Sequence, residues 1–304
     1  LVLAQSHPFD STPFHPLFRN VSLMAEPLAA ENLPYTVTDG QLAELGKHKT
    51  EEISPDLMIY VGGNTISKLL RQTLVRISDS CPVLMVNPSG TLEDVTTHTT
   101  HLVQSEPLAF LAFLSSIIPS NHSHPLYPTA STPQVSDSTS QLVASFESLV
   151  NPETDMVYYA NSTAIRLAAI HARHYVFCNR GINGIEGSLS TAVGAALAEP
   201  SKTVYCVIGD LSFFYDQNAL WNTAPLDNLR ILLLNSGGGE IFKTLPNATS
   251  SPAFHLIAAQ HSTSAKHLCH QYGIKHIPYI GNESMLQFFN SNRLTILEYN
   301  ICGQ

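Results

Sequence analysis

Basic side chains and long apolar segments are both scarce in this chain. Lys and Arg number 15 against 24 Asp and Glu, so the formal net charge is −9 over 304 residues. The basic residues form no run, so we expect neither nucleic acid nor an anionic membrane surface as a partner. The longest apolar segment, residues 108–118, is shorter than the roughly 20 residues that span a bilayer, so it predicts a packed helix and no membrane insertion.

Cysteine is also sparse, and its spacing fits neither a disulfide framework nor a metal site. The 5 cysteines are Cys81, Cys178, Cys206, Cys269 and Cys302. Three of them lie in or beside apolar segments, where a reduced and buried thiol is the usual state. The first residues carry no basic segment followed by an apolar one, so nothing there suggests secretion. We therefore expect a cytoplasmic protein.

Short apolar runs alternate with helical patterns along the whole chain, which predicts α/β layers around parallel sheets. A segment rich in Pro, Ser and His, residues 119–133, interrupts this alternation and cannot hold a regular element for long. We therefore predict two domains, residues 1–120 and 141–304, joined by a linker over residues 121–140. In the first domain we expect strands at residues 1–4, 21–24, 57–61 and 82–86 and a helix at residues 65–77.

The second half repeats the alternation more strongly. We expect strands at residues 156–160, 175–178, 204–208, 231–234 and 294–299. We expect helices after Asn161, after Gly187, and at residues 216–221, 264–272 and 283–290. This order of elements favours a second parallel sheet covered by helices.

Two strand-length apolar runs in this half end abruptly in small polar residues and glycine. Residues 204–211 read VYCVIGDL, and residues 231–239 read ILLLNSGGG. Such runs are typical of buried parallel strands, and ligands bind beyond the carboxyl ends of these strands. Asp210 would hold a hard cation such as Mg²⁺ there, and the glycines would let the backbone approach a diphosphate. The alternative for Asp210 is an N-cap of the following helix.

The two runs are separated by a helix-length stretch, and this arrangement resembles the thiamin diphosphate motif, which leads from Gly-Asp-Gly to a pair of asparagines. Three segments extend the likeness: residues 179–192 read NRGINGIEGSLSTA, residues 209–218 read GDLSFFYDQN, and residues 235–242 read NSGGGEIF. Together they resemble the SEPHCHC synthase (MenD) branch of the thiamin diphosphate-dependent enzymes. Residues 23–28 (LMAEPL) and 55–62 (PDLMIYVG) resemble, more loosely, the middle domain of that family.

The resemblance implies a Rossmann-like middle domain over residues 1–120 and a diphosphate-binding domain over residues 141–304, each with three layers. Family members carry a pyrimidine-binding domain before these two, and it supplies the glutamate that activates the cofactor. Because this chain opens with residues that resemble the first strand of the middle domain, we expect a fragment with little or no turnover on its own. The complete protein is expected to be a homodimer or homotetramer.

The chemistry that the resemblance implies is a decarboxylative carboligation. Thiamin diphosphate, bound with Mg²⁺ or Mn²⁺, carries the difficult step, while the protein binds and orients the reactants. The expected substrates are 2-oxoglutarate as donor and isochorismate as acceptor, in menaquinone biosynthesis. Two alternatives stay open: another thiamin diphosphate-dependent 2-oxo acid decarboxylase or synthase, and a non-catalytic module with a vestigial diphosphate pocket.

The metal ligands implied by the family are Asp210, Ser236 and the backbone carbonyl of Gly238. Ser236 stands where the motif normally has its second asparagine, and Leu211 stands where it has its third glycine. A serine hydroxyl is a shorter and weaker ligand than a carboxamide. Either Ser236 coordinates at some cost in affinity, or Asn235 or water takes its place.

The expected cofactor-binding residues follow the predicted strands. Asn161 and Ser162 directly precede a helical pattern, so they are N-cap candidates, and the resemblance makes Ser162 a neighbour of the diphosphate. Ile185 resembles the bulky residue that holds the cofactor in its bent, reactive conformation. The full set is Asn161, Ser162, Gly184, Ile185, Gly209, Asp210, Leu211, Ser212, Asn235, Gly238, Gly239 and Ile241.

The expected substrate-binding residues are two arginines and an apolar group. Arg166 and Arg180 would bind substrate carboxylates through the planar guanidinium, although a surface role is the usual alternative. The apolar group, Ile241, Phe242 and Leu245, resembles the wall of the substrate cavity, but its spacing equally fits the buried face of a short helix.

Other candidate sites are weaker. His261, His267 and His270 lack the compact spacing of a zinc site. Two pairs, His98 with His101 and His122 with His124, lie in loop-like segments and are expected to be solvated. Residues 61–64 (VGGN) follow a strand and precede a helix, but they lack the full spacing of a dinucleotide-binding motif.

Overall fold

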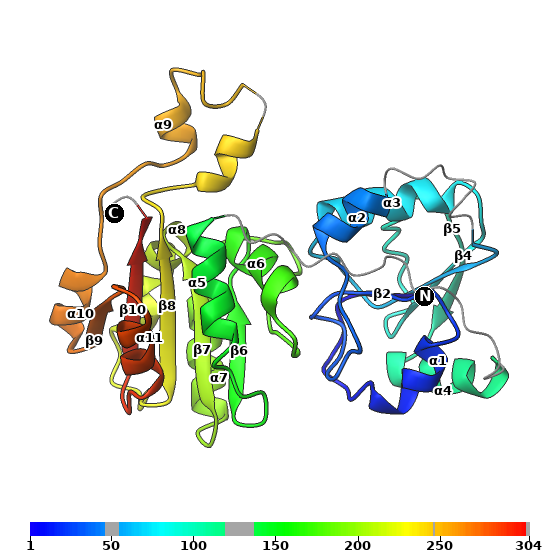
Figure 1. Cartoon of the computed structure of the whole chain (residues 1–304), viewed down its shortest axis with the longest axis horizontal. Coiled ribbons are helices and arrows are strands. Elements are labelled where there is room, and N and C mark those ends of the chain that lie inside the picture. Colours follow the sequence, from blue (N-terminus) through cyan, green and yellow to red (C-terminus); the bar gives the residue numbers. More distant parts are fainter. Residues whose placement is uncertain (46–54, 119–136, 246, 302–304) are drawn as a thin grey trace. The chain divides into compact units, whose positions relative to one another are not determined.

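The computed structural model describes residues 1–45, 55–118, 137–245 and 247–301. The chain divides into two compact units, Leu1–Val135 with Ala169–Tyr175, and Ser136–Ala168 with Val176–Gln304 (Figure 1). Each unit contains a five-stranded sheet whose strand pairs are all parallel, so the predicted α/β class is confirmed.

Part of the sequence interpretation falls outside the described residues. Most of the predicted linker lies there, and helix α5 (Ser138–Glu147) begins inside its predicted range. His122, His124 and Cys302 are also outside the described ranges. Among the helices that are described, none is long and apolar enough to cross a membrane.

The sheet of the first unit has the strand order β2-β1-β3-β4-β5. Its strands are β1 (Val2–Leu3), β2 (Met24–Ala25), β3 (Met58–Val61), β4 (Val83–Asn87) and β5 (Thr99–Gln104). Its helices are η1 (Thr12–Phe14), α1 (His15–Phe18), α2 (Asp39–Leu45), α3 (Lys68–Ser78) and α4 (Pro107–Ile117). The packed helix expected at residues 108–118 is therefore present as α4. Strand β5 was not predicted, because this edge strand is polar and largely exposed.

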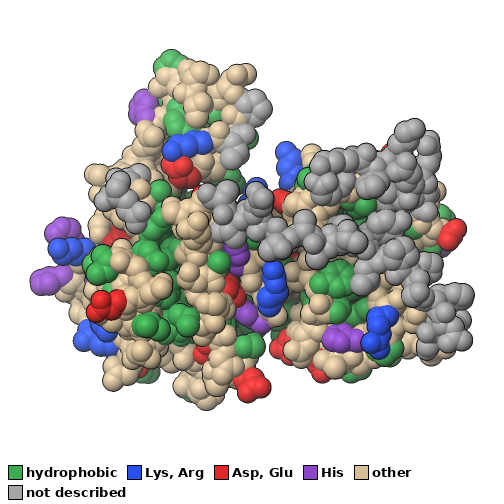
Figure 2. Space-filling view, in the orientation of Figure 1, with side chains coloured by type: hydrophobic (Ala, Val, Ile, Leu, Met, Phe, Trp, Pro, Cys, Tyr) green, Lys and Arg blue, Asp and Glu red, His purple; other side chains and the backbone are tan. Residues whose placement is uncertain are grey.

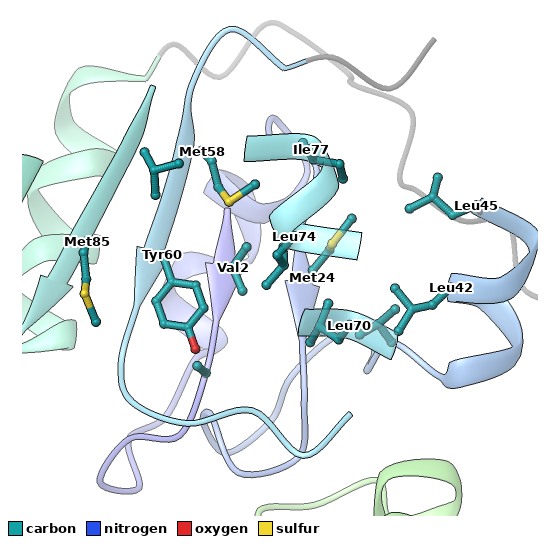
Figure 3. Close-up of a cluster of buried hydrophobic side chains, with 13 residues drawn as sticks. Val2, Met24, Leu42, Leu45, Met58, Tyr60, Leu70, Leu74, Ile77 and Met85 are labelled. Atoms are coloured by element: carbon teal, nitrogen blue, oxygen red, sulfur yellow. The ribbon is translucent and has the colours of Figure 1, made fainter. Parts of the chain in front are cut away.

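The central strand β3 of this sheet is buried on both faces. Met58 and Tyr60 of β3 pack with Leu74 of α3 in one hydrophobic cluster (Figure 3), whereas Val61 packs with Leu111 of α4 in another. Successive residues of a strand point to opposite faces, so one short apolar run supplies both clusters. Burial on both faces is typical of parallel sheets.

The turn at residues 61–64, which resembled a dinucleotide-binding loop, is closed by the chain itself. The buried carboxylate of Glu26 accepts hydrogen bonds from the backbone amides of Ile66 at 2.6 Å and Ser67 at 2.7 Å. A phosphate at the start of α3 would need these same amides. The side chain of Glu26 thus takes up the amides that a phosphate would need.

The sheet of the second unit has the strand order β6-β7-β8-β10-β9. Its strands are β6 (Asp155–Tyr159), β7 (Thr203–Gly209), β8 (Leu229–Asn235), β9 (Lys275–Pro278) and β10 (Thr295–Asn300). Its longer helices are α5 (Ser138–Glu147), α6 (Thr163–His171), α7 (Ser188–Ala198), α10 (Lys266–Tyr272) and α11 (Asn282–Phe289). Its shorter ones are α8 (Asp210–Tyr215), η3 (Gln217–Leu220), η4 (Glu240–Thr244) and α9 (Phe254–Ile257). The segment that carries α9 projects from the edge where the strands have their carboxyl ends (Figure 1).

One predicted element of this unit is wrong, and another is a 3-10 helix. Residues 175–178 form no strand, because only Phe177 pairs there, in an isolated bridge to Tyr158. The rings of these two residues stack with their centroids 4.8 Å apart. The helix predicted around residues 216–221 is present as the 3-10 helix η3. The helix α8, which was not predicted, precedes it and makes Asp210 the first residue of a helix at a strand end.

Candidate functional site

Asp210 follows β7, and its side chain forms hydrogen bonds with the turn that follows β8. Its carboxylate is buried, with 3% of the residue exposed, and Oδ1 accepts a hydrogen bond of 2.7 Å from the Leu211 amide. Oδ2 accepts hydrogen bonds of 2.9 Å from the backbone amides of both Ser236 and Gly238. The N-cap position of α8 is taken by Gly209, so the N-cap alternative for Asp210 is wrong. The side chain instead organises the turn that follows β8.

The hydroxyl of Ser236 lies between the other two predicted metal ligands. Its Oγ is 2.8 Å from the carbonyl oxygen of Gly238 and 3.4 Å from Oδ2 of Asp210. Adjacent ligands of an octahedral Mg²⁺ lie about 3 Å apart, because each metal–oxygen bond is about 2.1 Å long. The three residues therefore present a carboxylate, a hydroxyl and a carbonyl at a spacing that fits a small hard cation. In the described ranges, no three His, Cys, Asp or Glu side chains group into a metal site of another kind.

Asn235 holds the turn that follows β8. Its residue is 2% exposed, and Oδ1 accepts a hydrogen bond of 3.1 Å from the Gly237 amide. Its Nδ2 donates to the carbonyl of Thr263 at 2.8 Å and to Oε1 of Glu298 at 2.7 Å. These bonds use the carboxamide at both ends, so Ser236 is the better candidate for the second ligand.

The glycines of the turn are required by its backbone. Gly238 has a φ of +141°, and a Cβ there would lie 2.7 Å from the carbonyl oxygen of Ala258. The amide of Gly239 donates a hydrogen bond of 2.6 Å to that same carbonyl. The chain returning from α9 therefore packs directly on the turn, where a side chain would not fit.

Glu298, which no motif singled out, anchors this region from β10. Its buried carboxylate accepts hydrogen bonds of 2.7 Å from Nε2 of His276, from Nδ2 of Asn235 and from Oγ of Ser264. Burial alone would raise the pKa of Glu298, but these hydrogen bonds outweigh it and lower the pKa to about 2. The only sequence signal was one acidic residue inside an otherwise apolar strand.

Asn161, which follows β6, organises a second loop at the same edge of the sheet. Its Nδ2 donates to the carbonyls of Asn179 at 2.7 Å and Gly184 at 2.6 Å, and its Oδ1 accepts from Nη1 of Arg180 at 2.9 Å. The side chain is directed to this loop and not to the first turn of α6, so the N-cap assignment is wrong for Asn161. Ser162 adopts a left-handed conformation with a φ of +73°.

The same loop is tied to α8. The hydroxyl of Ser212 donates a hydrogen bond to the carbonyl of Ile185, so Ile185 is fixed near the end of β7. The two candidate arginines differ, because Arg180 is buried whereas Arg166 is exposed on α6. Burial raises the pKa of the Cys178 thiol to about 12, more than the neighbouring Arg180 lowers it, so this thiol stays protonated.

The apolar candidates lie on and just after η4. Ile241 and Phe242 are partly exposed, and Leu245 is 51% exposed, so the alternative of a fully buried helix face is wrong. Leu256 and Ile257 of α9 are also exposed. On the face shown in Figure 2, the few Lys and Arg side chains of the described residues are scattered and form no basic patch.

The fold and this site define a class of protein. Residues 159–287, which include the ends of β6, β7 and β8, match the family model for the thiamine pyrophosphate enzyme, C-terminal TPP binding domain. The second unit therefore resembles the TPP-binding domain of the thiamine pyrophosphate enzymes. Within that family the predicted resemblance to the SEPHCHC synthases is confirmed by comparison with curated proteins.

Several relatives carry the name 2-succinyl-5-enolpyruvyl-6-hydroxy-3-cyclohexene-1-carboxylate synthase. The protein of Bacteroides thetaiotaomicron is 39% identical over 246 residues, covering 77% of this chain and 43% of its own length. That of Phocaeicola vulgatus is 33% identical over 292 residues, covering 91% and 52%. That of Flavobacterium johnsoniae is 40% identical over 157 residues, covering 48% and 28%. The chain spans about half the length of the first two relatives.

Proposed function

We propose that the complete protein is a SEPHCHC synthase and that this chain supplies the diphosphate-binding side of its active site. The reaction would join 2-oxoglutarate, with loss of CO₂, to isochorismate in menaquinone biosynthesis, and it would use thiamin diphosphate with Mg²⁺ or Mn²⁺. Support comes from one observation above all: Asp210, Ser236 and Gly238 meet at the ends of β7 and β8 in a domain of the matching family.

The cation would be held by the Asp210 carboxylate, the Ser236 hydroxyl and the Gly238 carbonyl, and it would neutralise the cofactor's diphosphate. The space beside Gly209 is open, since a Cβ there meets no atom within 4 Å. A diphosphate can therefore approach the backbone at this strand end. When bound, the cofactor supplies the electron sink for decarboxylation.

The remaining residues would bind and orient the reactants. Asn161 fixes the loop that carries Arg180, and Ser212 fixes the backbone of Ile185, which would keep the cofactor bent. Arg166 and Arg180 would pair with substrate carboxylates. Ile241, Phe242 and Leu245 would exclude water from the reacting groups.

Two other functions compete with this proposal. A non-catalytic module is favoured by Ser236, which replaces the usual asparagine. However, a vestigial pocket has no reason to keep three donor atoms at ligand spacing around Asp210, so a working site is favoured. A different decarboxylase is disfavoured because the relatives carry the SEPHCHC synthase name. The exposed Leu245 and Leu256 are consistent with a homodimer or homotetramer of the complete protein.

Calorimetric titration of the chain with thiamin diphosphate, with and without Mg²⁺, tests the site. We expect saturable, Mg²⁺-dependent binding that is lost in Asp210→Ala and kept in Asp227→Ala, whose side chain is exposed in the same unit. Binding that survives in Asp210→Ala would contradict the proposed site. A full-length protein that is loaded with cofactor but inactive on 2-oxoglutarate and isochorismate would contradict the proposed reaction.

A further inference from the structure

His261 lies against the metal-binding carboxylate without belonging to the predicted ligand set. It follows α9, its side chain is 17% exposed, and its Nε2 is 3.4 Å from Oδ2 of Asp210. This separation is longer than the usual 2.7–3.2 Å of an N–H···O hydrogen bond. The buried Nε2 makes no hydrogen bond among the described residues, and Asp210 is the acidic group that it faces. A buried polar atom of this kind requires an explanation.

The backbone determines which ring nitrogen of His261 carries the proton. The amide of Thr263 donates a hydrogen bond of 3.0 Å to Nδ1. Nδ1 must therefore offer a lone pair, and in the neutral ring the proton is on Nε2. The atom that faces Asp210 is thus a donor. A histidine that binds a metal through one nitrogen normally donates from the other, so this hydrogen bond argues against His261 as a ligand.

The ring is held from both sides of the site. Phe214 of α8, the helix that begins at Asp210, meets the imidazole edge-on at 5.5 Å and 90°. The backbone amide of His261 donates a hydrogen bond of 3.0 Å to the carbonyl of Gly237 in the turn after β8. The position of the imidazole is therefore set by the same two segments that carry the proposed ligands.

The two oxygens of Asp210 are unequally occupied. Oδ2 accepts from the amides of Ser236 and Gly238 and faces His261, whereas Oδ1 accepts only from the Leu211 amide in the described structure. We propose that His261 is a positioning residue for the cation site: its Nε2–H donates to Oδ2 of Asp210 and holds the carboxylate in the orientation that brings it beside Ser236 and Gly238. This inference rests on the proposed function only in taking Asp210 as the cation ligand.

The first test reads the ring directly. A long-range ¹H–¹⁵N spectrum near pH 8, where an ordinary imidazole is neutral, reports which nitrogen is protonated. We expect the Nε2–H form for His261, assigned by loss of its signals in His261→Gln, and we expect those signals to shift in Asp210→Asn. The Nδ1–H form, or signals that do not respond to Asp210→Asn, would overturn the proposal.

The second test measures cation affinity in the presence of thiamin diphosphate. Partners of metal ligands typically contribute a factor of about 10 to 100 in affinity, so we expect a loss of that size for Mg²⁺ in His261→Phe. His261→Gln should recover part of it, because its amide can donate. His267→Gln, at an exposed site on α10, is the matched control and should bind as the unaltered chain does.

The two tests separate this inference from the proposed function. Unchanged affinity in His261→Phe would overturn the role of His261 and leave the cation site intact. An unaltered chain that binds neither cofactor nor cation would contradict the proposed function, while the ring spectrum and its response to Asp210→Asn would still decide whether His261 donates to Asp210.

Discussion

Asn235 at the end of β8 and Glu298 on β10 are joined by a hydrogen bond of 2.7 Å from Nδ2 to Oε1. The other end of the Asn235 carboxamide accepts from the amide of Gly237, in the turn that presents the proposed cation ligands. The buried carboxylate of Glu298 on β10 thus positions the backbone that follows the neighbouring strand β8. The turn after β8 is consequently anchored to the sheet.

Replacing Glu298 should therefore destabilise the second unit at neutral pH. In Glu298→Gln the new NH₂ group faces side chains that now donate hydrogen bonds to the carboxylate, including His276 and Ser264, and it cannot accept these bonds. We expect a loss of about 2–3 kcal/mol in the free energy of unfolding, measured with urea. Glu283→Gln, at an exposed site on α11, should change it by no more than about 0.5 kcal/mol. Equal stability of the two variants would show that the Glu298 network is not stabilising.

The same carboxyl group should give stability a specific pH dependence. The pKa of Glu298 is lowered to about 2 in the folded chain, below the value of about 4.3 for an unfolded glutamate. Its stabilisation is therefore complete above about pH 5 and is lost as the pH falls toward 2. We expect the stability difference between the unaltered chain and Glu298→Gln to shrink by about 2 kcal/mol over this window, measured by urea unfolding at each pH. A constant difference would contradict the lowered pKa.

The proposed ligands could be predicted from the sequence because they sit where strands end. Residues 204–208 of β7 and 231–234 of β8 are apolar runs, and they are followed by Gly209-Asp210 and by Asn235. Parallel neighbours end at the same edge of a sheet, so residues 25 positions apart are brought together by the fold class alone. The resemblance then assigned a role to each position.

Glu298 and His261 could not be predicted in this way, because their roles depend on distant partners. Glu298 reaches Asn235 only because β10 pairs with β8, a strand order that no local pattern encodes. His261 reaches Asp210 only because the chain returns from α9 onto the glycine turn. Strands β5 and β9 were missed for a simpler reason, since both lie at sheet edges and carry polar residues.

Gly238→Ala should disrupt both the fold and the cation site. The substitution forces a side chain into the left-handed region at a φ of +141° and places Cβ 2.7 Å from the Ala258 carbonyl. We expect a loss of about 2–4 kcal/mol in the free energy of unfolding and no measurable Mg²⁺-dependent cofactor binding. Gly194→Ala, in the interior of α7 where a Cβ meets nothing within 4 Å, should instead stabilise the chain by up to about 1 kcal/mol. Similar effects of the two changes would contradict the close packing at Gly238.

Gly209→Ala should separate binding from stability. The φ of Gly209 is −76°, which any residue adopts, and its Cβ would point into open space. We expect the free energy of unfolding to change by less than about 0.5 kcal/mol. If the diphosphate occupies that space, calorimetry should show cofactor affinity reduced at least about tenfold, because the methyl group blocks the approach. Unreduced affinity would place the diphosphate elsewhere.

Substitutions of Ser236 measure how Mg²⁺ affinity depends on having serine in place of the usual asparagine. In Ser236→Ala the hydroxyl is absent, so a hydroxyl ligand predicts Mg²⁺ affinity about tenfold lower at saturating thiamin diphosphate. In Ser236→Asn a carboxamide oxygen is supplied, and affinity should equal or exceed that of the unaltered chain. The backbone amide of residue 236 still donates to Asp210 in both variants, so the turn itself is preserved. Ser236→Ala binding as tightly as the unaltered chain would show that water, and not the hydroxyl, completes the coordination.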